Sequence, residues 1–376
     1  MLKQQSVFFT ESSKNLGGQE LQLVQQMLEL EKRGIKTKLF CRNDSAIYEY
    51  ALQLGLKIVT TRFRNALDVK SIYTIYKYLL KDCPSAVICH SGHDSIVSAV
   101  AVRLYRCTLL KKTPRVIRMR TYQPGVPSAF PYNVLFDKTY TPSNYLRKQI
   151  LANPKINPDQ VDVLYPGIDF SRLDTPSEAL PKDLITWIER VSGPLLVHGA
   201  MLRAEKGHSI ILEALETLTA EIPNIRYLIV GDGPLRKELE HRVQVKGLEQ
   251  QVYFAGFISN IGEVLRYATI AVFPSLYEPL GMFQIEAQYL RIPTLAHNIG
   301  GIPETIQNNV TGRLVESSEP SVWCHEIKQI LLNEEVRKQY GENSRHYVLK
   351  NFGVETNINH LIEICFGVST SNEIIP

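Results

Sequence analysis

Residues 6–41, SVFFTESSKNLGGQELQLVQQMLELEKRGIKTKLFC, decide the fold. The apolar residues 6–10 predict a short buried strand, and a turn with two glycines follows. Residues 20–32 carry Leu and Val at helical spacing, Gly34 ends that helix, and residues 35–41 predict a second strand. Because such a strand–turn–helix–strand unit joins parallel strands, the sequence predicts an α/β fold built on a parallel sheet.

The same alternation of strands and helices continues along most of the chain. Further strands are predicted at 86–90, 115–120, 194–200, 226–233, 252–256, 270–275 and 293–298, and helices at 94–106, 208–219, 234–246, 260–267, 281–290 and 320–333. A proline-containing stretch with little apolar content, residues 166–183, interrupts the pattern, which then starts afresh. We therefore expect two doubly wound parallel-sheet domains that face each other across a cleft. The expected boundaries are a first domain at 1–167, a linker at 168–183, a second domain at 184–350 and a terminal segment at 351–376.

Composition excludes several protein classes. With 376 residues, 44% hydrophobic and 21% charged, the chain is neither disordered nor a disulfide-stabilised miniprotein. No apolar run approaches the roughly 20 residues that cross a bilayer, and the first residues do not resemble a signal peptide. Six cysteines stand at irregular spacings without a C-x-x-C pair, so we expect reduced thiols and no metal site. The expected location is the cytoplasm.

Charge is distributed unevenly along the chain. Residues 1–180 hold 25 Lys and Arg against 15 Asp and Glu, whereas residues 181–376 hold 17 against 23. Within the first half, residues 95–136 contain no acid and seven bases: Arg103, Arg106, Lys111, Lys112, Arg115, Arg118 and Arg120. This stretch predicts an anionic partner, such as acidic lipid headgroups or a phosphorylated substrate, or else a solvated helix face. Nucleic acid is disfavoured because aromatic residues do not interleave with the bases.

The most informative motif is EPLGMFQIE at 278–286, between a predicted strand and a predicted helix. Leu280, Gly281, Met282 and Phe283 supply backbone N–H groups at the helix N-terminus, an arrangement that suits a phosphate group. The carboxylate of Glu286, further along the helix, has the chemistry to accept hydrogen bonds from ribose hydroxyls. The alternative is that both glutamates are ordinary helix-associated carboxylates.

Here the chain resembles the retaining glycosyltransferases of family 4, which have the GT-B fold of two Rossmann-like domains. The spacing E-x7-E between Glu278 and Glu286 is similar to the signature of that family. Five further segments match family patterns in the same order: LGGQE at 16–20, GAMLRAEKG at 199–207, VGDGP at 230–234, FAG at 254–256 and GGIPE at 300–304.

The resemblance implies roles for individual residues. Glu286 would hold the ribose of a sugar nucleotide, the amides of residues 280–283 would bind the β-phosphate, and Lys206 would neutralise the leaving pyrophosphate. Glu278 would face the donor sugar as a catalytic residue, and the glycine turn of Gly17 and Gly18 would contribute to donor binding. The family's usual arginine five residues before the lysine is Met201 here, so Arg203 is the expected substitute.

In the first domain the resemblance points to His90, in the segment CHSGHDS at 89–95, as a histidine near the donor sugar. Such a histidine could move a proton or orient hydroxyls. His93 is a weaker candidate for acceptor binding. Arg120, in the stretch RMRTY at 118–122, is similar to an acceptor-binding arginine of relatives that act on lipopolysaccharide.

The expected function is thus transfer of a hexose-type sugar from a nucleotide sugar, UDP-sugar first, to a glycan or glycolipid acceptor. The acceptor is expected to be anionic or lipid-linked, such as a lipopolysaccharide core or another envelope polysaccharide, bound by the basic first domain near the inner membrane face. No metal or other cofactor is expected. Two alternatives remain open: a sugar-nucleotide epimerase of the same fold, and a non-catalytic subunit that binds a partner enzyme. The family also implies that the last helix, within 351–376, crosses back to the first domain.

Overall fold

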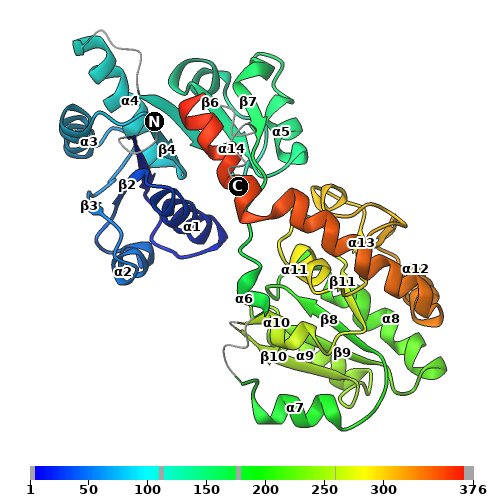
Figure 1. The fold of residues 1–376 in the computed structure, drawn as a ribbon. Helices are drawn as coiled ribbons and strands as arrows, with labels where there is room; N and C mark the ends of the chain where they lie inside the picture. The colour runs from blue at the N-terminus through cyan, green and yellow to red at the C-terminus, as the bar shows by residue number, and fades with distance from the viewer. Residues whose placement is uncertain (1–4, 110–113, 175–178, 259, 368–376) are drawn as a thin grey trace, which may run out of the picture. The chain divides into compact units, whose positions relative to one another are not determined.

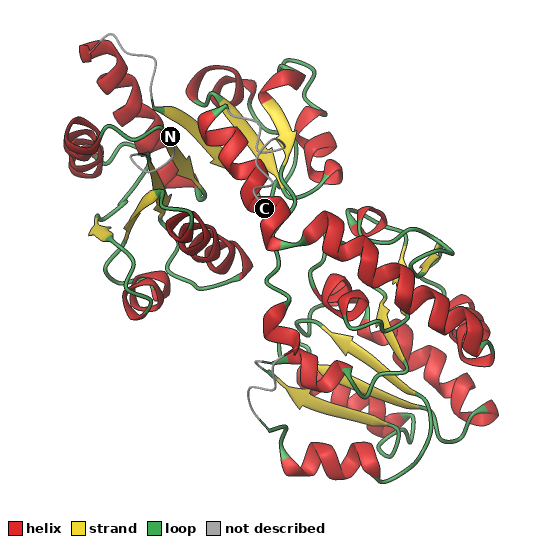
Figure 2. Cartoon of the chain, viewed as in Figure 1, coloured by secondary structure: helices red, strands yellow, loops and turns green. Residues whose placement is uncertain are grey.

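The computed structural model describes residues 5–109, 114–174, 179–258 and 260–367. The chain divides into two compact units. Unit 1 comprises Met1–Gly167 and Val354–Pro376, and unit 2 comprises Ile168–Gly353. Each unit holds one parallel sheet with helices on both faces (Figures 1 and 2).

Unit 1 is built on seven parallel strands in the order β3-β2-β1-β4-β5-β6-β7. The strands are β1 (Ser6–Glu11), β2 (Lys36–Cys41), β3 (Ile58–Thr60), β4 (Ala86–Cys89), β5 (Arg115–Met119), β6 (Lys138–Thr141) and β7 (Val161–Val163). The helices are α1 (Gly18–Lys32), α2 (Ala46–Gln53), α3 (Val69–Asp82), α4 (Gly92–Leu109), α5 (Asn144–Leu151) and α14 (Val354–Phe366). Strand order reverses between β1 and β4, and such a switch point is where open α/β sheets bind ligands.

The C-terminal helix α14 belongs to unit 1, although it follows all of unit 2 in the sequence. Its buried side chains share one hydrophobic cluster with β1 and α1: Ile358, Leu361, Ile362, Ile364 and Cys365. Hydrogen bonds also hold the helix: Gln26 Nε2 donates to Asn357 Oδ1 (3.0 Å), and Asn357 Nδ2 donates to the carbonyl of Tyr165 (2.6 Å). The terminal segment therefore completes the core of unit 1.

Unit 2 repeats the architecture with six parallel strands in the order β10-β9-β8-β11-β12-β13. The strands are β8 (Leu195–Gly199), β9 (Arg226–Val230), β10 (Val252–Gly256), β11 (Ile270–Phe273), β12 (Thr294–His297) and β13 (Arg313–Val315). The helices are α6 (Ser171–Asp174), α7 (Lys182–Glu189), α8 (His208–Glu221), α9 (Arg236–Val245), α10 (Ile261–Leu265), α11 (Phe283–Tyr289), α12 (Pro320–Leu332) and α13 (Glu334–Phe352). The strand order reverses between β8 and β11, which is the switch point of this sheet.

The doubly wound fold class predicted from sequence is confirmed, and three local predictions differ from the structure. Residues 168–174 were expected to lie in a linker, but they pack on unit 2, where Phe170 stacks on Tyr289 at 4.3 Å between ring centroids. The helix predicted at 281–290 begins two residues later, because Gly281 has a left-handed φ of +90°. Alternation alone did not predict β3, β6, β7 or β13, each only three or four residues long.

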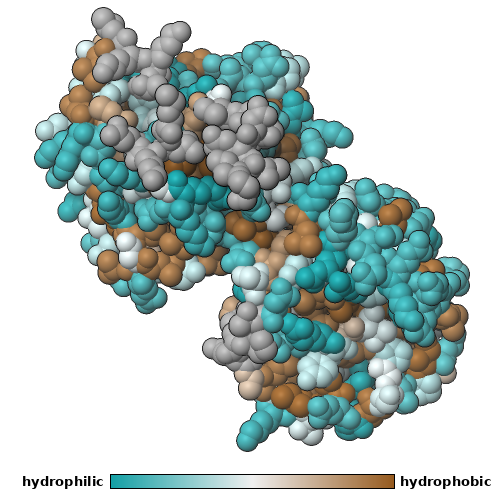
Figure 3. Space-filling view, viewed as in Figure 1, coloured by the Kyte–Doolittle hydropathy of each residue, from teal (hydrophilic) through white to brown (hydrophobic). Residues whose placement is uncertain are grey.

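The outer surface of unit 2 over α12 and α13 is mostly polar on the face seen in Figure 3. Within the described part of the chain, no helix combines the length and the hydropathy needed to cross a membrane.

Candidate functional site

In unit 2, three loops meet at the carboxyl edge of the sheet around the β8/β11 switch point. They are residues 200–207 after β8, 274–282 after β11 and 298–304 after β12. Backbone hydrogen bonds join them: Leu276 N donates to the carbonyl of Glu205 (2.7 Å), and Gly301 N donates to the carbonyl of Glu278 (2.9 Å). The loops thus form one connected rim.

Close backbone approach explains why this rim is rich in glycine. A Cβ on Gly301 would lie 2.0 Å from the carbonyl oxygen of Pro279, and a Cβ on Gly207 would lie 2.0 Å from that of Pro274. Gly207 also has a φ of +70°, which other residues rarely adopt. The glycines of the sequence motifs therefore hold the loops together in this unit.

Lys206 and Glu278 flank the switch point and form an ion pair, with Lys206 Nζ donating to Glu278 Oε2 at 2.5 Å. Lys206 closes the short turn Ala204–Lys206 after β8, and Glu278 lies in the loop after β11. Both side chains are about four-fifths buried, with relative exposures of 21% and 17%. The structure therefore brings these two sequence-predicted residues into direct contact.

Glu286, in α11, is buried and forms an ion pair with Arg172 of α6. Burial raises the pKa of Glu286, and the adjacent guanidinium opposes that rise. Only Oε1 of the carboxylate is engaged by the arginine; among the described residues, Oε2 makes no hydrogen bond. Arg172 is a residue that the sequence analysis missed, because it lies in the stretch interpreted as a linker.

The segment 280–283 holds three apolar residues around Gly281. Leu280 is buried, Met282 is exposed, and Phe283 is the first residue of α11. A Cβ on Gly281 would meet the amide group of Gln284 at 2.1 Å, so glycine is required here by both space and φ. Gln284 Nε2 in turn donates to the carbonyl of Leu280 (2.7 Å), which fixes the start of the helix.

Arg203 does not contact Glu278. Its guanidinium is half-exposed and lies 3.9 Å from the carboxylate of Glu205 in the same turn. Met201, the departure from the family pattern, is also exposed. The structure therefore places Arg203 on the rim, but outside the contact that Lys206 makes.

Two histidines are buried beneath the turn that carries Lys206. The rings of His198 and His208 lie 4.1 Å apart, and His198 Nδ1 shares a hydrogen bond of 2.8 Å with the hydroxyl of Tyr227. Burial lowers the pKa of His208 to about 4 and that of His198 as well. Both rings are therefore neutral at pH 7 and serve as packing beneath the site.

At the β1/β4 switch point of unit 1, His90 is buried directly after β4. Its Nδ1 lies 3.2 Å from the carbonyl oxygen of Thr10, so this nitrogen carries the proton and donates it. Burial lowers the pKa of His90 to about 4. The neutral ring thus suits accepting a hydrogen bond from a hydroxyl at Nε2, and it does not suit a proton shuttle near pH 7.

Two buried carboxylates beside His90 were missed from sequence. Asp94 accepts hydrogen bonds from the hydroxyls of Thr10 (2.7 Å) and Ser12 (2.9 Å). Burial raises the pKa of Asp94 to about 8, and the charge of Glu11 adds to the rise. Glu11 ends β1, and a polar residue closing an apolar strand is the signal that could have identified it.

Glu11 also anchors a chain of hydrogen bonds along this edge. Gln19 Nε2 donates to Glu11 Oε2 (2.8 Å), and Thr121 Oγ1 donates to Gln19 Oε1 (2.6 Å). The chain joins the ends of β1 and β5 through the first turn of α1. We call this hydrogen-bonded group of Glu11, Gln19 and Thr121, with the adjacent His90, the polar floor of unit 1.

The remaining candidates in unit 1 surround this floor. Gly17 is the N-cap of α1, where its N–H donates to Glu20 Oε2 (2.8 Å), and a Cβ on Gly18 would meet nothing within 4 Å. His93 is exposed in the first turn of α4. Arg120 Nε donates to Gln123 Oε1 (3.2 Å).

The described bases of the acid-free stretch 95–136 do not form a continuous basic surface for an anionic partner. Arg106 pairs with Asp137, Arg115 donates to the carbonyl of Ile364, and Arg118 is buried against Tyr132. Lys111 and Lys112 lie outside the described residues. Most of the described bases of this stretch are therefore engaged within unit 1.

Among the residues that the structure describes, no group of three or more His, Cys, Asp or Glu side chains could hold a metal ion. The six cysteines form no disulfide, and four of them are buried: Cys41, Cys89, Cys324 and Cys365.

Comparison with known families assigns both halves of the chain. Residues 16–172 match the model of Glycosyltransferase Family 4, and residues 189–347 match that of Glycosyl transferases group 1. Two doubly wound sheets, each with its glycine-rich or polar edge at a switch point, define the class of GT-B glycosyltransferases. The chain belongs to the family 4, or group 1, glycosyltransferases.

Curated relatives are similar over parts or nearly all of the chain. An alpha-D-kanosaminyltransferase of Streptomyces kanamyceticus is 30% identical over 153 residues, which cover 40% of each chain. A UDP-Gal:alpha-D-GlcNAc-diphosphoundecaprenol alpha-1,3-galactosyltransferase of Escherichia coli is 22% identical over 364 residues, 93% of each chain. The matched part of this chain thus spans less than half the length of the S. kanamyceticus relative and most of the length of the E. coli relative.

Solved structures show the same fold. A glycosyltransferase from Rickettsia africae ESF-5 has a TM-score of 0.82 at 19% identity and covers 98% of this chain and 99% of its own. Anabaena Alr3699/HepE in complex with UDP has a TM-score of 0.81 at 18% identity, and the match covers 97% of this chain and 100% of that one. At these identities the likeness establishes the fold.

Proposed function

We propose that this protein is a retaining glycosyltransferase that moves a hexose-type sugar from a UDP-sugar to a hydroxyl of a glycan or glycolipid acceptor. The observation that carries the proposal is the Lys206–Glu278 ion pair, which flanks the switch point of unit 2. Similar proteins support the choice of donor, since one is named for transfer from UDP-Gal and another was solved with UDP.

In this proposal the donor binds to the rim of unit 2. The free Oε2 of Glu286 accepts hydrogen bonds from the ribose, while Arg172 keeps the buried carboxylate oriented. The backbone amides of residues 280–283 and the ammonium of Lys206 face the diphosphate. Breaking the bond between the sugar and the diphosphate places charge on the departing oxygen, and fixed cations and amides stabilise that charge. No metal is needed for this step, because Lys206 and the amides supply the compensating charge.

Glu278 is proposed to orient Lys206 and to contact the donor sugar. Arg203, half-exposed on the same rim, supplies a secondary contact to the diphosphate in place of the arginine that Met201 replaces. Gly18, where an added Cβ would meet nothing within 4 Å, and the neighbouring Gly17 are proposed to admit the donor sugar at the start of α1.

The acceptor is proposed to bind unit 1 at the polar floor around Glu11 and His90. His90 orients an acceptor or donor hydroxyl through Nε2, while Arg120 and His93 lie near the edge of this floor as further contacts. The name of the E. coli relative, which specifies a diphosphoundecaprenol-linked sugar as its acceptor, supports an envelope glycan or its lipid-linked precursor as the acceptor here, handled at the inner face of the membrane.

The test is to incubate the protein with UDP-glucose, UDP-galactose and UDP-N-acetylglucosamine and to follow each mixture by proton NMR. We expect release of UDP and of a sugar whose anomeric proton initially has the configuration of the donor. Lys206→Met should lower the rate of this release about 10²–10³-fold, whereas Lys328→Met, which removes a paired lysine from α12, should leave it unchanged. Formation of the opposite anomer first would exclude retention, and an isomerised UDP-sugar without UDP release would identify an epimerase.

A further inference from the structure

A pocket of about 480 Å³ lies in unit 1 beyond the carboxyl ends of β2 and β3. It is lined by Arg42, Asn43, Asp44, Arg62 and Arg64. Three guanidinium groups and one carboxylate give the lining a net charge of +2. None of these residues belongs to the acid-free stretch that the sequence analysis singled out.

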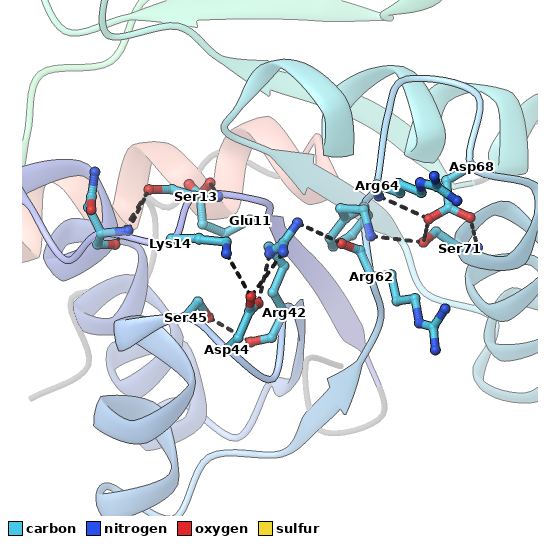
Figure 4. A network of polar contacts seen from close by, with 12 residues as sticks. Glu11, Ser13, Lys14, Arg42, Asp44, Ser45, Arg62, Arg64, Asp68 and Ser71 are labelled. Atoms are coloured by element: carbon cyan, nitrogen blue, oxygen red, sulfur yellow. Dashed lines mark hydrogen bonds and ion pairs between the residues drawn. The ribbon is translucent and has the colours of Figure 1, made fainter.

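The carboxylate in this pocket is already neutralised (Figure 4). Arg42 binds both oxygens of Asp44, from Nε at 2.9 Å and from a terminal nitrogen at 3.0 Å. Lys14 Nζ also lies 2.9 Å from Asp44. The hydrogen bonds from Arg42, and after them that from Lys14, lower the pKa of Asp44. The carboxylate is therefore ionised and paired at neutral pH.

Arg62 and Arg64 are the unpaired charges of the pocket. Both side chains are exposed, and among the described residues neither guanidinium has a hydrogen bond, an ion pair or an aromatic contact. Figure 4 accordingly draws dashed lines to the carbonyl of Arg62 and to the backbone N–H of Arg64 only. Two neighbouring like charges without a partner favour an anionic ligand.

The loop that carries these arginines is rigidly built. Phe63, between them, has a left-handed φ of +44° and a fully buried ring. Its N–H donates to Ser71 Oγ (3.1 Å), and Arg64 N donates to Asp68 Oδ2 (3.0 Å). A bulky residue adopts this conformation only where its surroundings enforce it, and such strain clusters at functional sites.

We propose that Arg42, Arg62 and Arg64 form a phosphate-binding pocket that holds a phosphate group of the acceptor. Guanidinium groups bind phosphate oxygens through paired N–H donors, and a net charge of +2 matches the charge of about −1.5 to −2 on a phosphate monoester at pH 7. The assignment of that phosphate to the acceptor rests on the proposed function; the pocket itself does not.

The position of the arginine pocket in the sheet supports the acceptor as the source of the phosphate. β3 is two strands from β1, so with roughly 4.8 Å between strands the pocket lies on the order of 10 Å from the polar floor at the β1/β4 switch point. An acceptor whose hydroxyl lies at the floor would therefore present its phosphate about that far away. The phosphate could be part of a lipid-linked or a water-soluble molecule.

A second basic pocket provides a matched control. It lies at the opposite, amino edge of the same sheet and includes Lys36 and Lys57. Both lysines are exposed, so Lys36→Gln with Lys57→Gln removes two charges from unit 1 without touching the arginine pocket.

The test is site-resolved modification of arginine by phenylglyoxal, quantified by mass spectrometry on the full chain. Without phosphate we expect fast labelling of Arg62 and Arg64 and slow labelling of Arg42. Inorganic phosphate at about ten times its dissociation constant should slow labelling at Arg62 and Arg64 about tenfold. Labelling of exposed Arg103, outside the pocket, should not change, and chloride or acetate at the same ionic strength should not protect.

Any of these results would overturn the proposal: equal rates at Arg62 and Arg64 with and without phosphate, equal protection by acetate, or protection by phosphatidylglycerol vesicles alone. The last result would identify a membrane surface in place of a phosphate pocket. Persistence of the protection in Lys36→Gln/Lys57→Gln supports the proposal, and its loss would assign the effect to overall charge.

A second measurement separates this pocket from the donor site. Arg62→Gln/Arg64→Gln should keep the thermal shift that UDP gives, and its loss would assign the pocket to the donor. Because phosphate protection needs no sugar nucleotide, the pocket can stand even if UDP neither binds nor reacts, in which case only the proposed function fails.

Discussion

The two units share one topology but differ in how the carboxyl edge of the sheet is built. In unit 2 the edge consists of loops in backbone contact around charged pairs, and a Cβ on Gly301 would meet a carbonyl oxygen at 2.0 Å. In unit 1 a Cβ on Gly18 would meet nothing within 4 Å, and buried hydrogen-bonded groups such as Glu11 and Asp94 form the floor. The comparison teaches that close backbone contacts shape the edge in unit 2, whereas buried, hydrogen-bonded side chains shape it in unit 1.

The largest expected effect comes from removing α14, which should affect the two units unequally. Ending the chain at Gly353 deletes four buried aliphatic side chains from the core of unit 1, worth about 8 kcal/mol together, comparable with the whole stability of a domain. Calorimetry should show loss of the unit 1 transition and persistence of that of unit 2. Retention of both transitions would contradict the assignment of α14. Leu361→Ala should give a smaller loss in unit 1, and exposed Glu355→Ala little.

Charge removal at the unit 2 rim is the next largest effect. Lys206→Met should lower the transfer rate about 10²–10³-fold, because it removes a fixed charge that stabilises the leaving diphosphate. The side chain of Arg203 is half-exposed and does not contact Glu278. Arg203→Met should therefore lower the transfer rate less than tenfold. Steady-state kinetics of UDP release measures both. A larger effect for Arg203 than for Lys206 would reverse the proposed roles.

Glycine substitution compares the two edges directly. Gly301→Ala should reduce the stability of unit 2 by about 1–3 kcal/mol, because the added Cβ meets backbone that cannot yield easily. Gly18→Ala, in the first turn of α1, should be neutral or slightly stabilising in unit 1. Denaturant unfolding of both variants tests the difference, and similar losses would remove the contrast between the edges.

The last prediction is a dependence of stability on pH, which needs no substitution to observe. Because the pKa of buried His208 is about 4 when folded and near 6.5 when unfolded, the unfolded state binds the proton first as pH falls. The free energy of unfolding of unit 2 should therefore drop by about 1.4 kcal/mol per pH unit per such histidine between pH 6.5 and 4.

Unit 1 should respond less to acid. There His90 acts in the same direction, but Asp94, whose pKa is raised to about 8, is protonated more readily when folded and stabilises unit 1 as pH falls. In unit 2 the lowered pKa values of two histidines oppose the raised pKa of one carboxyl group, that of Glu286. His208→Gln should flatten the melting temperature of unit 2 between pH 6.5 and 5. An unchanged slope would show that this histidine is not the titrating group.

In unit 2 the residues singled out from sequence lie in contiguous motifs. Lys206, Glu278 and Gly301 each lie in a loop directly after a strand, and the resemblance of these motifs to family patterns located them. Arg172 escaped prediction because its partner, Glu286, is 114 residues away and only the fold brings them together. Whether these residues bind a donor stays a prediction.

Unit 1 was predicted less completely for a physical reason. Charge counting pointed to residues 95–136, yet Arg106, Arg115 and Arg118 bind groups within the unit. The arginines left without partners, Arg62 and Arg64, follow a strand of three residues that periodicity does not detect. Phe63, between them, has a left-handed backbone that no composition rule reveals.

The most direct test of the central claim is a thermal-shift panel with UDP, GDP, ADP and CMP on three proteins: wild type, Glu286→Ala and Glu326→Ala. Glu326 is a matched control, because it is also mostly buried and paired with an arginine, Arg313, which opens β13 at the opposite edge of the sheet. A nucleotide at about 100 times its dissociation constant stabilises by about 2.7 kcal/mol, which shifts melting by several degrees. We predict a shift with UDP in wild type and Glu326→Ala and none in Glu286→Ala. An equal shift in all three proteins, or none with any nucleotide, would contradict the account.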